Sequence, residues 1–128
     1  MKCSIKELLA DILNTVHVVE AGVDASGWHY KKYSDGTLEA ERTRNIGQYT
    51  ISTTVASPIR SGATVSSALP SEAISGDVEI TLVGNTSNSA CWMERIGNLE
   101  WRIVKVTTGN VTLQGLTVSE RTIGARWK

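Results

Sequence analysis

The sequence predicts a mainly β protein, an antiparallel β-sandwich of jelly-roll type over residues 22–128, preceded by a short coiled-coil helix over residues 1–21. Apolar residues in the first 20 positions recur at heptad spacing, whereas the chain after Gly22 is rich in Thr, Val, Ser and Gly with alternating apolar residues. Short apolar runs separated by Gly and Asn turns favour a sandwich or barrel over a parallel α/β sheet. An oligomerising stalk that leads into a β head indicates an assembly protein before an enzyme.

The N-terminal helix is predicted from a seam of apolar residues at spacings of 4, 3, 4 and 3, formed by Ile5, Leu9, Ile12, Val16 and Val19. If Leu9 and Val16 take the a positions, β-branched residues fill the d positions, a pattern that favours three or four strands over two. The expected assembly is a homotrimer. The alternative is an ordinary amphipathic helix packed on its own β domain, because Leu8 and Leu13 widen the apolar stripe.

The first hairpin is predicted over Trp28 to Arg42, around the turn Ser34-Asp35-Gly36. An Asp-Gly pair supplies the positive φ angles that a tight turn needs. A two-residue loop would place Lys32 opposite Glu39, and a three-residue loop would shift this register by one residue.

The second hairpin is predicted around Gly97-Asn98, which separates Ala90 to Ile96 from Leu99 to Thr107. A two-residue loop gives one apolar face and one mostly polar face, and this agreement normally fixes a register. The predicted opposite pairs are Ile96 with Leu99, Glu94 with Trp101, Trp92 with Ile103, Arg95 with Glu100, and Met93 with Arg102. Trp92 and Trp101 should therefore share one face and both be buried.

Four further strands complete the expected head. A long loop or sheet-to-sheet crossing is expected at Ser57 to Ser75, which contains both prolines, and Thr108-Gly109-Asn110 should form a turn. The predicted strands are Tyr49 to Ala56, Asp77 to Val83 with Val78, Ile80 and Leu82 on one face, Asn110 to Val118, and Arg121 to Trp127.

Composition excludes several classes of partner. The 13 basic and 13 acidic side chains cancel, and no basic run is present, so neither nucleic acid nor an anionic membrane is expected as a partner. Cys3 and Cys91 form no metal-binding spacing and are expected as free thiols. The chain shows no signal peptide or membrane span and is expected to be made in a cytoplasm.

Catalytic patterns are weak. Glu39 and Glu41 share one face of a strand, about 6–7 Å apart, which fits glycosidase chemistry only loosely. Lys31, Lys32 and Arg42 nearby should keep both carboxylates ionised, so a solvated charged ladder is the favoured interpretation. His17, predicted inside the helix, and His29 have no matching ligands for zinc. We expect no catalytic residues, no metal and no cofactor.

Residues 27–39, Gly-Trp-His-Tyr-Lys-Lys-Tyr-Ser-Asp-Gly-Thr-Leu-Glu, resemble the aromatic-x-Lys-aromatic-x-x-Gly-x-x-Glu signature of receptor-binding head domains in tail fibres of tailed bacteriophages and prophages. A Trp often takes the place of Tyr33 in that family, and another often lies at the position of Glu41. Three of the aromatic and basic side chains, Trp28, Tyr30 and Lys32, should share one face of the strand. They could form a core-forming hairpin, which is favoured, or a ligand platform.

The resemblance implies a trimeric, non-enzymatic fibre tip in the virion tail, which contacts other tail proteins and attaches to a bacterial surface glycan. Flat Trp rings pack well against pyranose rings, and the chain has four: Trp28, Trp92, Trp101 and Trp127. The ligand-binding residues are not assigned by the sequence. The alternatives are a glycan-cleaving tail enzyme and a purely structural tip or adaptor without a ligand.

Overall fold

The computed structural model describes residues 15–84 and 91–128, and these residues form nine strands that are hydrogen-bonded into one antiparallel sheet. The mainly β, antiparallel class predicted from the sequence is confirmed. The strands are β1 (Val18–Val23), β2 (His29–Tyr33), β3 (Thr37–Ala56), β4 (Ile59–Gly62), β5 (Val65–Ser66), β6 (Ser75–Gly84), β7 (Cys91–Gly97), β8 (Glu100–Val106) and β9 (Val111–Arg126).

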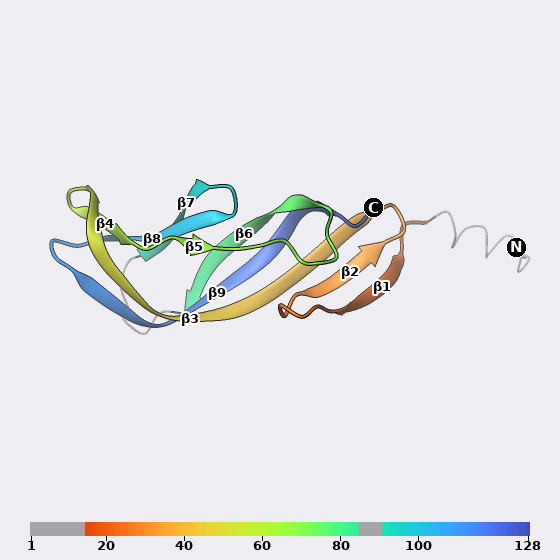
Figure 1. The fold of residues 1–128 in the computed structure, drawn as a ribbon, viewed down its shortest axis with the longest axis horizontal. Coiled ribbons are helices and arrows are strands. Elements are labelled where there is room, and N and C mark those ends of the chain that lie inside the picture. Colours follow the sequence, from red (N-terminus) through yellow and green to blue (C-terminus); the bar gives the residue numbers. More distant parts are fainter. Residues whose placement is uncertain (1–14, 85–90) are drawn as a thin grey trace, which may run out of the picture.

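Two long strands, β3 and β9, pair with each other and run along the long axis of the molecule (Figure 1). In one half of the molecule the strand order is β1-β2-β3-β9-β6. In the other half β3 pairs with β4 and β4 pairs with β8, which also pairs with β5 and β7. Register shifts at Asn45/Gly47 and Gly47/Tyr49 separate the halves, where Gly47 and Gly115 have φ angles of 66° and 59°. Bulges of this kind bend a strand without ending it, so the predicted strands 110–118 and 121–127 are one strand.

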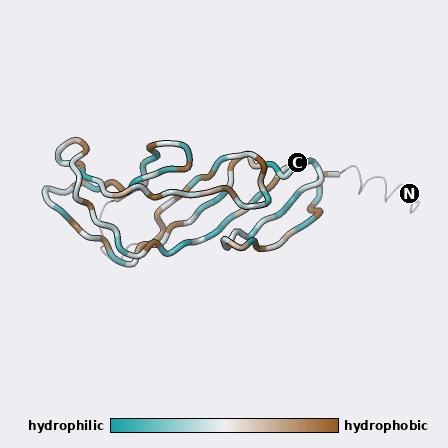
Figure 2. The backbone as a smooth tube through the Cα atoms, in the orientation of Figure 1, coloured by the Kyte–Doolittle hydropathy of each residue, from teal (hydrophilic) through white to brown (hydrophobic). Residues whose placement is uncertain are grey.

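The core is a single cluster to which both halves of the sheet contribute. Hydrophobic and hydrophilic residues alternate along the long strands (Figure 2), as expected for strands with one buried face. As predicted, Val78 and Ile80 of β6 share the buried face. The other fully buried members of the cluster include Trp28, Leu38, Ile51, Ile103, Leu113, Leu116 and Val118.

The predicted helix is wrong where the structure describes it, because no described residue is helical and Val18 to Ala21 belong to β1. The run Val18-Val19 is β-branched and favours a strand, and β1 pairs with β2 on both sides of a register shift at Val19. Val16 is 57% exposed and Val19 is 48% exposed. The sheet therefore begins before residue 22, inside the segment assigned to the helix. Ile5, Leu9 and Ile12 lie outside the described residues.

The first hairpin has a three-residue loop, Ser34-Asp35-Gly36, with Gly36 at φ 93°. Lys31 therefore lies opposite Glu39 and Lys32 opposite Leu38, one residue from the register of a two-residue loop. A turn followed by a left-handed glycine is the usual geometry of three-residue hairpins.

The predicted register of the second hairpin is wrong by one residue. Gly97 pairs with Glu100, so the turn is Asn98-Leu99, with Leu99 at φ 56°, and a register shift between Arg95 and Gly97 follows. The shift places Arg95 opposite Trp101 and Trp92 opposite Val104. Trp92 and Trp101 consequently lie on opposite faces.

The segment expected as a loop at residues 57–75 contains two short strands, β4 and β5. Residues 67–74 of this segment are held in place by backbone hydrogen bonds from Ser67 N–H to the Leu99 carbonyl and from Ile74 N–H to the Arg126 carbonyl. The predicted turn at residues 108–110 is confirmed between β8 and β9.

Candidate functional site

The signature segment forms part of the protein interior on one face of β2. Trp28 is fully buried, and Lys32 lies near the rings of Tyr30 and Trp127, at 5.7 and 5.4 Å from their centroids. Lys32 Nζ also forms ion pairs with Glu20 and Glu72 at 2.8 and 2.7 Å, and hydrogen bonds with these carboxylates raise its pKa. This face ties β1, β2 and the segment 67–74 together, so it is a packed surface and not an open platform.

A buried ion triad, which sequence reasoning missed, continues this inner face. Glu120 on β9 is fully buried and pairs with Arg42 and Arg44 on β3; the hydrogen bond from Arg44 Nε to Glu120 Oε1 measures 2.7 Å. Arg42 donates to the Ser26 carbonyl and lies 4.5 Å from the centroid of the Trp28 ring. The alternation of inward and outward residues along the strands could have indicated the triad. Arg42 and Arg44 have the same parity as the inward residues of β3, and Glu120 has the same parity as those of β9.

The opposite, outward face of the same strands carries a row of charged side chains. Cross-strand pairing places His29 of β2, Glu41 of β3, Arg121 of β9 and Glu79 of β6 next to one another in register. A second row contains Lys31 and Glu39. Glu39 and Glu41 thus share one face as predicted. Arg42 and Lys32, which were expected to lie near these carboxylates, face the interior instead.

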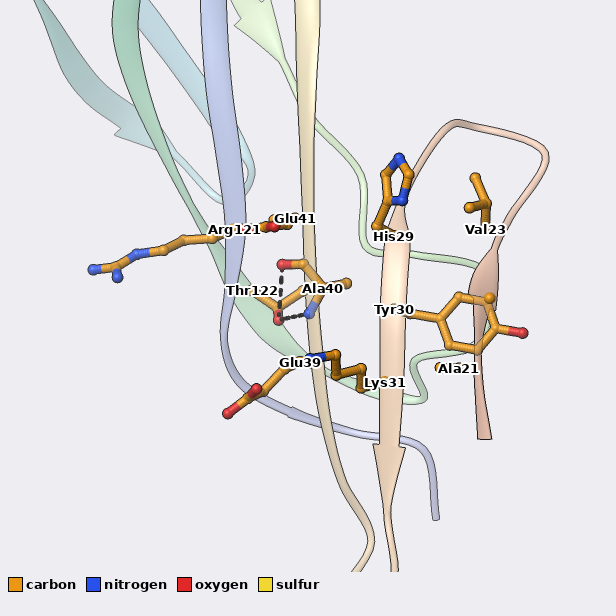
Figure 3. Close-up of a pocket in the computed structure, with 11 residues that line it drawn as sticks. Ala21, Val23, His29, Tyr30, Lys31, Glu39, Ala40, Glu41, Arg121 and Thr122 are labelled. Atoms are coloured by element: carbon orange, nitrogen blue, oxygen red, sulfur yellow. Dashed lines mark hydrogen bonds between the residues drawn. The ribbon is translucent and has the colours of Figure 1, made fainter. Parts of the chain in front are cut away.

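A groove of about 710 Å³ is hollowed into this outward face (Figure 3). Ala21 of β1, which pairs with Lys31, has a small side chain on this face and leaves room for the hollow. Gly22 of β1 and Ala40 of β3 also line the groove, but both occupy inward positions, and the Ala40 side chain belongs to the buried core. At Ala40 the β3–β9 ladder is interrupted, and the Thr122 hydroxyl bridges the gap: the Ala40 N–H donates to Thr122 Oγ1 at 2.9 Å, and this hydroxyl donates to the Ala40 carbonyl at 3.5 Å. The other lining residues are Val23, His29, Tyr30, Lys31, Glu39, Glu41 and Arg121.

The charged groups of the groove differ in how they are satisfied. Tyr33 Oη donates to Glu39 at 2.8 Å, which raises the pKa of Tyr33, and Arg121 is paired with Glu79 at 2.6 Å. The side chains of His29, Lys31 and Glu41 form no hydrogen bond or ion pair with another described residue. The groove therefore presents a cation, an imidazole and a carboxylate that are all available to a ligand.

The tryptophans divide between interior and surface. Trp28 and Trp101 are buried, and the half-buried Trp127 donates its indole N–H to the Tyr33 carbonyl at 2.8 Å. Trp92, predicted to be buried with Trp101, is 42% exposed, because the observed register of its hairpin places it on the face opposite Trp101.

Among the described residues, no group of three or more His, Cys, Asp or Glu side chains is arranged to hold a metal ion. The same part of the chain contains no helix of the length and apolarity that a membrane span requires. Comparisons of the chain with protein-family models, with curated proteins and with solved structures give no match.

Proposed function

We propose that this chain is the receptor-binding head of a phage-type tail fibre, a homotrimer that attaches to a bacterial surface glycan without cleaving it. The observation that carries the proposal is the groove on the outward face, where the side chains of His29, Lys31 and Glu41 pair with no other residue that the structure describes. Sugars present alternating hydroxyl donors and acceptors, and a groove with both cationic and anionic groups satisfies both kinds.

The charge balance of the groove favours a neutral glycan over a polyanion. The groove contains the cation Lys31, the carboxylates Glu39 and Glu41, and Arg121, whose charge is paired with Glu79. A chain of phosphates bound there would therefore lie next to two carboxylates. Hydrogen bonds from ligand hydroxyls to ionised groups are stronger than neutral ones. The groove therefore suits a hexose or an N-acetylated sugar.

Trimerisation fits the position of the groove. The groove borders β1, an edge strand of the described sheet that begins at Val18, two residues after the heptad residue Val16, and contains Val19. Three copies joined through that segment would hold three grooves around one axis, and avidity can raise affinity by roughly 10² to 10⁴. Within this proposal the head is a jelly-roll-like sandwich, supported by a core that joins Trp101 and Ile103 of β8 with Val78 of β6.

The proposal is tested by glycan-array binding of the native chain and of a Lys31→Ala, Glu41→Gln variant. We expect the variant to lose binding, while Asp77→Asn, which alters an ion pair with Arg95 that does not line the groove, retains it. Unchanged binding by the double variant would remove the groove from the proposal, and a blank array for the native trimer would favour a structural tip or adaptor.

Two further measurements separate the remaining alternatives. Light scattering should give the mass of a trimer for the native chain and a smaller mass for Ile12→Asp, Val16→Asp; a native monomer would contradict the assembly. Hydrolysis of a cell-wall polysaccharide by the native protein, abolished in Glu39→Gln, would replace attachment by a glycan-cleaving activity.

A further inference from the structure

The outward face of the β7–β8 hairpin places an exposed indole beside an ion pair. Trp92 and Glu94 are alternate residues of β7, so they project from the same face about 6–7 Å apart. Arg102 of β8 lies opposite Glu94 and binds it, with 2.7 Å between Arg102 Nη2 and Glu94 Oε1. The register shift described above creates this grouping, since the predicted register would have turned Trp92 inward.

The Trp92 indole lies next to a fully buried residue of the neighbouring strand. Val104, its cross-strand neighbour, is fully buried, and directly opposite residues in a sheet have Cβ atoms about 4.5–5.5 Å apart. The ion pair holds the neighbouring positions of both strands in register. The face therefore combines a flat apolar surface with an adjacent hydrogen-bond donor and acceptor.

We propose that this face is a second glycan contact, which binds one hexopyranose ring, and this inference rests on the proposed attachment function. The axial C–H groups of the sugar would stack on Trp92, while its hydroxyls donate to Glu94 and accept from Arg102. This contact is separate from the groove, which lies on β1, β2, β3 and β9.

The ion pair favours a sugar over another protein surface as the occupant. Glu94 and Arg102 are both partly exposed, and an apolar protein surface laid over them would remove water from two charges, a cost that the attraction between them often fails to repay. Sugar hydroxyls replace that water with hydrogen bonds of their own.

Acrylamide quenching of tryptophan fluorescence tests the proposal. Trp92 is 42% exposed and is the only exposed tryptophan in the described part of the chain. The probes are N-acetylglucosamine and methyl β-galactoside, with sorbitol as the control, since sorbitol has the hydroxyls but no ring to stack. We expect at least one sugar, and not sorbitol, to protect Trp92 from acrylamide. Trp92→Ala should bind that sugar about tenfold more weakly or worse.

The groove variant Lys31→Ala, Glu41→Gln separates the two sites. We expect protection of Trp92 to persist in it. If the native trimer binds sugar without protecting Trp92, the second contact is refuted and attachment through the groove stands. If Trp92 is shielded without sugar and becomes accessible when the trimer dissociates, the face is a subunit interface and the inference is wrong. If the native chain binds neither sugars nor the array, both proposals fail.

Discussion

Glu120→Gln is predicted to be strongly destabilising, because it removes the only anion of the buried triad and leaves two guanidinium groups near one another. Removing one partner of a buried ion pair typically costs about 3–5 kcal/mol. The side chain of Arg42 is only 9% exposed, whereas that of Arg44 is 31% exposed and can reach water. The cost should therefore come mainly from Arg42 and lie towards the lower end of that range.

Urea unfolding followed by circular dichroism measures this cost. We expect the midpoint to fall with an unchanged slope, as for a loss of stability alone. A chain of this size should lose roughly 10–20 °C in Tm for such a change. Protein concentration must be held constant, since association contributes to apparent stability.

Two matched variants make the reasoning refutable. Glu79→Gln removes the partner of Arg121 from an exposed ion pair and should cost at most about 1 kcal/mol. Replacing the whole triad with apolar residues, as Arg42→Met, Arg44→Leu, Glu120→Met, should recover much of the stability, because packed apolar groups often match a buried ion pair. If Glu120→Gln costs no more than Glu79→Gln, the triad does not contribute as the structure implies.

The other predictions concern a carboxylate, a hairpin register and a turn. Burial opposes ionisation of Asp24, but hydrogen bonds from the N–H groups of Trp28, Ser71 and Ser26 outweigh it and lower the pKa of Asp24. The ionised carboxylate therefore stabilises the folded protein at any pH above the pKa of Asp24 in the unfolded chain. This contribution to stability is lost as the pH falls through the lower pKa of the folded state. The urea-midpoint difference between native protein and Asp24→Asn should thus shrink below about pH 4, and a constant difference would contradict this assignment. Trp101→Ala should cost about 3–5 kcal/mol in urea unfolding and Trp92→Ala under about 1 kcal/mol; equal costs would restore the predicted register. Gly36→Ala should cost about 1–3 kcal/mol, because Gly36 has φ 93° and an added Cβ would lie 2.9 Å from the Lys128 carbonyl oxygen. Gly109→Ala, with open space around it, is the control, and equal thermal stability of the two variants would refute the turn geometry.

Alternation and turn residues were sufficient to predict the β class, both hairpins and the buried face of β6. They were not sufficient for register, because a register depends on loop length and bulges. Gly36 could serve either a two-residue or a three-residue turn, and nothing local shows that Leu99 adopts a positive φ angle. One residue of shift moved Trp92 from the predicted core to the surface.

The triad and the groove could not be predicted from the pattern of neighbouring residues, for a different reason. Glu120 lies 78 residues from Arg42 and 76 from Arg44 in sequence, so only the pairing of β3 with β9 brings these charges together. The groove likewise combines four strands. The heptad spacing before residue 20 was real as a pattern, but backbone pairing with β2 determined the structure of Val18 to Ala21.

The β3–β9 pairing has a mechanical consequence. The two strands run along the long axis of the molecule (Figure 1), and the hydrogen bonds of an antiparallel pair lie across the strands. Tension that pulls β3 and β9 in opposite directions along this axis would load those bonds together in shear, so they would share the force. A pull across the sheet at the edge strand β1 would instead load its bonds to β2 one after another, and β1 would peel away at a lower force.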